Sequence, residues 1–136
     1  MYLNLKQMTH TNLTSTVERL MELPQAIQEL QMEILDLNTE SNKSTELISN
    51  IQSKIKVEIN AEVDANGKKT FSNAEARDAE FVERTKFNSE LAGLRSEHDA
   101  LQREIQEKKI QVECLSNEQR NSRSILNFFA GENETA

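Results

Sequence analysis

The fold is decided by residues 23–37, which read LPQAIQELQMEILDL. The apolar residues of this stretch alternate in steps of four and three, which is the spacing of the contact positions in a coiled coil. They are Leu23, Ile27, Leu30, Ile34 and Leu37. Counting onward in the same steps of four and three passes through a polar interval at residues 38–45 and reaches an apolar residue again at Ile48. The sequence therefore predicts a first long helix over residues 23–63.

Pro24 sets the expected start of this helix, because proline has no amide hydrogen and is best tolerated in a first turn. Residues 1–22 are then expected to form an N-terminal segment with a short helix, which is either separate or continuous with the long helix through a kink. The interval at residues 38–45 contains residues of low helix propensity. A loop would have no reason to keep the count in phase. One continuous helix is therefore favoured over a turn near Asn42, which would give a bundle of shorter helices.

A second long helix with the same spacing is predicted over residues 72–129. It opens with Ser72-Asn73-Ala74-Glu75, the pattern of a capping box in which the serine and glutamate side chains satisfy each other's backbone amides. Its contact positions begin at Phe87 and end at Phe129, and they include His98. Residues 130–136 are expected to form an acidic tail.

The turn between the helices is predicted at residues 64–71, around the strong turn signal Asn66-Gly67. Apolar and polar residues alternate over residues 55–63, which also allows a short β-hairpin closed by this turn. A helix that ends in a loop is favoured, because the isoleucines of this stretch also keep helical spacing.

Folding back at this turn places Leu37 near His98, Ile48 near Phe87 and Leu30 near Ile105. Apolar residues then face apolar residues along most of the seam between the helices. The sequence thus predicts a single all-α domain over residues 1–136, built as a long antiparallel helical hairpin (coiled coil). Each helix has further apolar residues that a lone hairpin does not cover, so we expect the protein to be oligomeric.

The composition supports this fold class. The chain has 136 residues, of which 36% are hydrophobic and only 4% aromatic, which suits long helices with narrow apolar seams. The net charge of −7 opposes non-specific binding to nucleic acid or to an anionic membrane. Cys114 is the only cysteine, and no apolar run approaches the ~18 residues of a membrane span. We therefore expect a cytoplasmic protein without membrane contact.

Catalytic and metal-binding patterns are weak in this sequence. Residues 62–73 share the acidic and glycine positions of an EF-hand loop, but Asn73 stands where a bidentate glutamate should close the site. His98 lacks a second ligand one turn away, and Cys114 lacks an activating neighbour. We expect no catalytic residue, no metal, no cofactor and no enzymatic activity.

Three candidate interaction surfaces follow from the pattern. The expected seam and oligomer residues are Leu23, Ile27, Leu30, Ile34, Leu37, Ile48, Leu94, Leu101, Ile105, Val112 and Leu115. The tip cluster combines cations with an aromatic ring, as in sites for single-stranded nucleic acid, and comprises Lys54, Lys56, Lys68, Lys69 and Phe71. Phe128 and Phe129 offer a hydrophobic handle for a protein partner.

The stretch from Asp64 to Asn73, followed by a charged helix, resembles the small coiled-coil proteins found in phage and prophage genomes. In size, acidity and layout the chain is also similar to phage recombination mediators of the UvsY type, and this resemblance implies rings that engage single-stranded DNA. From the residues themselves we expect a non-enzymatic assembly or interaction protein that self-associates through apolar helix stripes. The alternative is an accessory factor for DNA recombination or replication that binds single-stranded DNA at the tip cluster.

Overall fold

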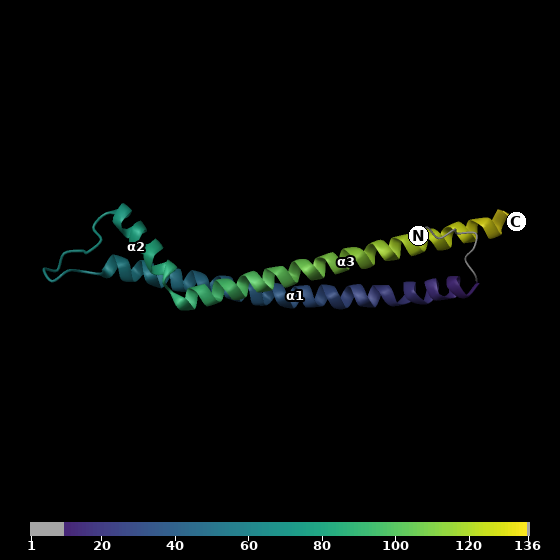
Figure 1. Cartoon of the computed structure of the whole chain (residues 1–136), viewed down its shortest axis with the longest axis horizontal. Helices are drawn as coiled ribbons and strands as arrows, with labels where there is room; N and C mark the ends of the chain where they lie inside the picture. Colours follow the sequence, from purple (N-terminus) through teal and green to yellow (C-terminus); the bar gives the residue numbers. More distant parts are fainter. Residues whose placement is uncertain (1–9, 136) are drawn as a thin grey trace. The chain divides into compact units, whose positions relative to one another are not determined.

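The structure is a computed structural model that describes residues 10–135. It contains helices α1 (His10–Ala61), α2 (Ala74–Lys86) and α3 (Ser89–Thr135) (Figure 1). Within these residues there is no strand, only an isolated antiparallel bridge between Val63 and Lys69. The predicted all-α fold class is confirmed. No helix in the described range is long and apolar enough to cross a membrane.

The described residues group into two compact units. One unit joins α1 up to Asp36 with α3 from Ile105, and the other is Leu37–Glu104. We refer to them as the terminal unit and the loop unit and describe each by itself.

The start of α1 distinguishes the two alternatives for the N-terminal segment at residues 1–22. The short helix there is not separate, because α1 runs unbroken from His10 through Pro24. Proline inside a helix removes one backbone hydrogen bond. Pro24 is exposed, so water can satisfy the carbonyl group that loses its donor. Residues 1–9 lie outside the described residues.

The polar interval at residues 38–45 is helical, as the unbroken phase of the count predicts. Ser41 and Ser44 stand at contact positions there, and both side chains are buried. The turn near Asn42 that was the alternative does not form. Because serine side chains are small, Ser41 and Ser44 fit into the contact between the helices of the loop unit at positions where larger apolar residues usually stand.

The loop between α1 and α2 is longer than the predicted turn at residues 64–71, because α1 ends at Ala61 and α2 begins at Ala74. The carboxylate of Asp64 accepts hydrogen bonds from the backbone amides of Asn66 and Lys68, at 2.9 and 3.0 Å. Gly67 has a φ of 78°, which is the left-handed region that glycine adopts without strain. Backbone hydrogen bonds from the Asp64 amide to the Lys68 carbonyl and from the Thr70 amide to the Glu62 carbonyl, at 2.7 and 3.0 Å, flank the bridge between Val63 and Lys69, so the loop has one antiparallel bridge but no extended β-hairpin.

The predicted single helix at residues 72–129 is wrong in two respects. The N-cap of α2 is Asn73, whose side chain accepts a hydrogen bond from the Ala76 amide at 2.8 Å, so the expected capping box on Ser72 does not form. The helix also stops after Lys86, and the side chain of Asn88 caps α3 by accepting from the Leu91 amide at 2.8 Å. Asparagine is among the best N-cap residues, and two such caps divide the segment.

The break changes the surroundings of Phe87, which was expected at the seam beside Ile48. Phe87 is 71% exposed, whereas Leu91 is fully buried. At its other end, α3 continues to Thr135 and includes most of the predicted acidic tail at 130–136.

Every predicted seam residue is buried or half-buried, and Leu23 and Ile105 are the most deeply buried of that set. Ion pairs from Arg19 to Glu118 and from Glu33 to Lys108 show that the two helical segments of the terminal unit run antiparallel. Burial in both units therefore follows the spacing of apolar residues along each helix.

Candidate interaction surfaces

A polar network centred on the buried side chain of Ser41 lies between α1 and α3 in the loop unit. The Ser41 hydroxyl oxygen accepts a hydrogen bond from Gln102 Nε2 at 2.6 Å and lies 3.3 Å from His98 Nδ1. Because this oxygen accepts from the amide, its own hydrogen can be donated to Nδ1, which fits the tautomer of His98 with its hydrogen on Nε2. Thr45 donates to the Ser41 carbonyl at 3.1 Å.

This network corrects the predicted register of the loop unit. The seam count set Leu37 beside His98, but it is Ser41, one helical turn later, that contacts His98. His98 is half-buried at its predicted seam position. Among the described residues no buried side-chain nitrogen or oxygen lacks a hydrogen-bond partner. Satisfied polar groups at a seam favour one alignment over its neighbours, because sliding the helices would leave them unpaired.

One helix face in the terminal unit is exposed and uncharged. Its residues follow each other along α1 in steps of three, four and seven, so they share one side of the helix. This α1 face consists of Val17, Met21, Gln28, Met32 and Leu35, of which the four apolar residues are 42–77% exposed. A shallow groove of about 770 Å³ follows the same part of α1, and its lining includes Met21 and Met32 together with the carboxylates of Glu29 and Glu33.

A second exposed and uncharged face lies on α3 in the same unit. This α3 face consists of Ile110, Cys114, Asn117, Asn121 and Phe128, again in steps of three, four and seven. Ile110 is 59% exposed and Phe128 is 44% exposed. The thiol of Cys114 is free and exposed. The two predicted partner residues differ in exposure, because Phe128 belongs to the α3 face while Phe129 is half-buried at its seam position, but their rings remain in edge contact with centres 5.6 Å apart.

The tip cluster is only partly brought together. Lys54, Lys68 and Lys69 are exposed. Phe71, however, is half-buried, and the guanidinium carbon of Arg84 lies 5.6 Å from the centre of its ring. Glu80 and Glu62 both hydrogen-bond to this guanidinium, and these bonds raise the pKa of Arg84 above its usual value. A base that stacked on this ring face would have to displace a cation held by two carboxylates.

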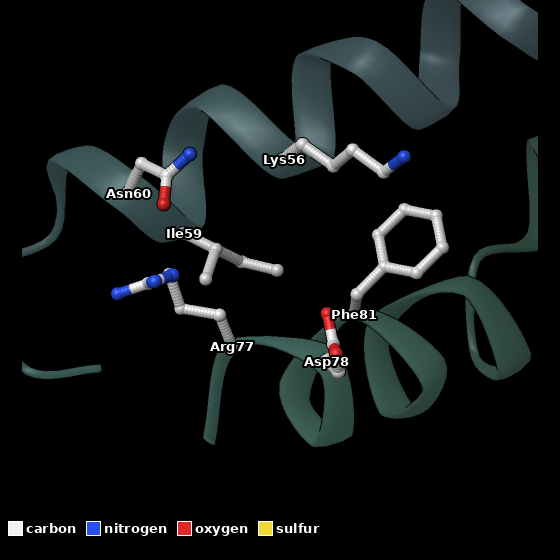
Figure 2. A pocket seen from close by; sticks show the side chains of 6 residues that line it. All are labelled: Lys56, Ile59, Asn60, Arg77, Asp78 and Phe81. Carbon is white, nitrogen blue, oxygen red and sulfur yellow. The ribbon is translucent and has the colours of Figure 1, made fainter. Parts of the chain in front are cut away.

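Lys56, the remaining member of the tip cluster, faces a different ring. Its ammonium nitrogen lies 5.0 Å from the centre of the Phe81 ring, at one side of a cavity of about 260 Å³ (Figure 2). Ile59 projects between α1 and α2, while Arg77 and Asp78 come from α2 (Figure 2). The lining combines cations, an amide and a carboxylate, so it does not select one sign of ligand charge. Sequence reasoning missed this cavity, because Phe81 is not in phase with the seam.

The terminal unit has its own ion pair between α1 and α3. The Arg19 side chain donates to Glu118 at 2.8 Å, and this hydrogen bond lowers the pKa of Glu118 and raises that of Arg19. Both side chains are about two-fifths exposed, so solvent screens the pair and its contribution to stability is small.

Neither metal-binding residues nor similarity to known proteins identifies a further site in the described part of the chain. Within the described side chains, no group of three or more histidine, cysteine or acidic residues could hold a metal ion. In comparisons with known proteins, no family model, curated protein or solved structure matches this chain. Inference about function therefore rests on the surfaces described above.

Proposed function

We propose that this chain is a non-enzymatic coiled-coil protein, an antiparallel helical hairpin that self-associates through apolar stripes on its helices. One observation carries the proposal. Among the described residues five large apolar side chains are buried, whereas eleven are between 42% and 77% exposed. Single exposed apolar residues are ordinary on protein surfaces, but apolar residues that follow one helix face in sequence typify a helix covered by another helix.

Absence of charge on the α1 and α3 faces supports the same proposal. Charged residues make up 29% of the chain, yet neither face includes one. On a helix that only meets water, charged residues are expected on every exposed side. The polar members of both faces are amides and a thiol, which are easier to bury than charges.

Light scattering coupled to size-exclusion chromatography tests the proposal directly. We expect a mass above that of one 15.6 kDa chain, falling as the protein is diluted. Thermal unfolding followed by circular dichroism should shift to higher temperature as the protein concentration rises, because association stabilises the folded state. A single-chain mass at every concentration, with a constant unfolding temperature, would overturn the proposal.

Seam substitutions provide a second test. Leu30→Asp and Ile105→Asp each place a carboxylate at a half-buried or buried contact position. Both are expected to lower helicity and to disrupt the assembly together, because the seam must form before the outer faces are presented. A helical and soluble single chain from either variant would contradict this order of dependence.

A further inference from the structure

One border of each face carries charged residues that are mainly of one sign, and the sign differs between the two faces. The α1 face is bordered by carboxylates that follow one side of the helix, namely Glu18, Glu22, Glu29 and Asp36, all exposed. The α3 face is bordered on one side by exposed cations with a single carboxylate, Glu113, between them. These cations are Lys109, Arg120 and Arg123. An acidic border on one uncharged face thus has a basic counterpart on the other.

We infer that the α3 face of one copy of this chain docks on the α1 face of a second copy. This inference rests on the proposed self-association and names the two surfaces that carry it. With their charged borders side by side, two α1 faces would set carboxylates against carboxylates, and two α3 faces would set cations against cations. Like charges at an interface oppose association, so pairing of unlike faces is favoured.

The lengths of the two faces also agree. The α1 face extends from Val17 to Leu35 and the α3 face from Ile110 to Phe128, which is the same number of residues in each. At a rise of 1.5 Å per residue, each face is about 27 Å long. Apolar residues stand near both ends of each face, so one face covers the other without leaving an apolar end exposed.

Pairing of unlike faces has a consequence for the assembly. A dimer keeps one unused α1 face on one copy and one unused α3 face on the other, so further copies add in the same way until a ring closes or a filament grows. The interface is heterologous, and blocking either face on all copies must stop assembly.

Two single-face variants test the pairing. Met32→Asp blocks the α1 face and Ile110→Asp blocks the α3 face, and both side chains are more than half exposed, so the fold should survive each substitution. Leu47→Asp is the matched control, because Leu47 is 51% exposed on another side of α1. Circular dichroism verifies helicity in all three variants, and light scattering with chromatography gives their masses.

We expect each single-face variant to remain a single chain at concentrations about tenfold above those at which the unmodified protein and Leu47→Asp assemble. An equimolar mixture of Met32→Asp and Ile110→Asp should form a complex of two chains and no larger species. In that complex the intact α3 face of the first variant covers the intact α1 face of the second. Raising the salt concentration should weaken it, because ions screen the charged borders.

Other outcomes overturn the inference in distinguishable ways. Assembly of Ile110→Asp like the unmodified protein would mean that α1 faces pair with each other, and assembly of Met32→Asp would mean the same for α3 faces. Single chains in the mixture, or loss of assembly by Leu47→Asp, would also refute the pairing while leaving self-association intact. An unmodified protein that is a single chain at all concentrations would refute the proposed function and this pairing together.

Discussion

Leu91 provides a sharp test of where the loop unit has its core. Leu91 is fully buried, whereas Leu47, in the same unit, is 51% exposed. Replacing each with alanine makes the same chemical change on a helix, so any difference in helix propensity cancels. The comparison therefore isolates the contribution of burial.

The expected magnitudes follow from these exposures. Truncating a fully buried leucine costs about 2–5 kcal/mol, because apolar contacts are lost and a cavity remains. Half of the Leu47 side chain is already exposed to water, so Leu47→Ala should lower the free energy of unfolding by less than about 1 kcal/mol. We expect Leu91→Ala to lower the free energy of unfolding by at least about 1 kcal/mol more than Leu47→Ala does.

Urea unfolding followed by circular dichroism measures both values. All variants should be compared at the same protein concentration, so that association contributes equally, and the denaturant dependence of the unfolding free energy should be unchanged. Equal losses for the two variants would refute the reasoning, because the apolar core of the loop unit would then not include Leu91.

Three further predictions concern the terminal unit, the start of α3 and the tip cluster. The hydrogen bond from Arg19 lowers the pKa of Glu118 in the folded protein below the unfolded carboxylate pKa of about 4.3. The ion pair therefore stabilises the fold at pH values above about 4.3, and this stabilisation is lost as the pH falls through the pKa of Glu118 in the folded protein. Glu118→Gln should lower the melting temperature at neutral pH but not in strong acid, and an equal loss at both would contradict this. Asn88→Ala removes the cap on the Leu91 amide and should cost about 1 kcal/mol in urea unfolding. The exposed mid-helix control Asn50→Ala should cost nothing, and equal costs would show that the cap is unimportant. Replacing the whole tip cluster with alanine should leave electrophoretic mobility shifts of single-stranded DNA unchanged. A shift that weakens with salt and disappears in this variant would instead support the DNA-binding alternative.

Contact positions were predictable from the sequence because burial follows the spacing of apolar residues. The count even located buried polar residues, since Ser41 and Ser44 fall in phase with the isoleucines around them. The spacing of apolar residues cannot reveal a helix break that leaves this spacing unchanged. Phe87 and Leu91 are one turn apart in the count, so the pattern does not reveal that Asn88 ends one helix and caps the next. The preference of asparagine for N-cap positions was the available signal.

The register and the interaction surfaces needed the structure for other reasons. Moving one helix by a turn still sets leucine against isoleucine, so apolar spacing alone does not choose between adjacent alignments. Contact between Ser41 and His98 distinguishes them. The uncharged faces were open to sequence analysis, because the absence of charge around Met32 and Ile110 is visible in the printed residues.

The hydrogen-bonded group formed by Ser41, His98 and Gln102 also limits how this protein can change in length. Inserting seven residues into α1 between Ser41 and the loop would preserve the apolar count of that helix, but it would carry the serine away from its two partners. An insertion of equal length between the loop and His98 would bring the three together again. Relatives with longer or shorter arms should therefore gain or lose whole heptads in both helices at once.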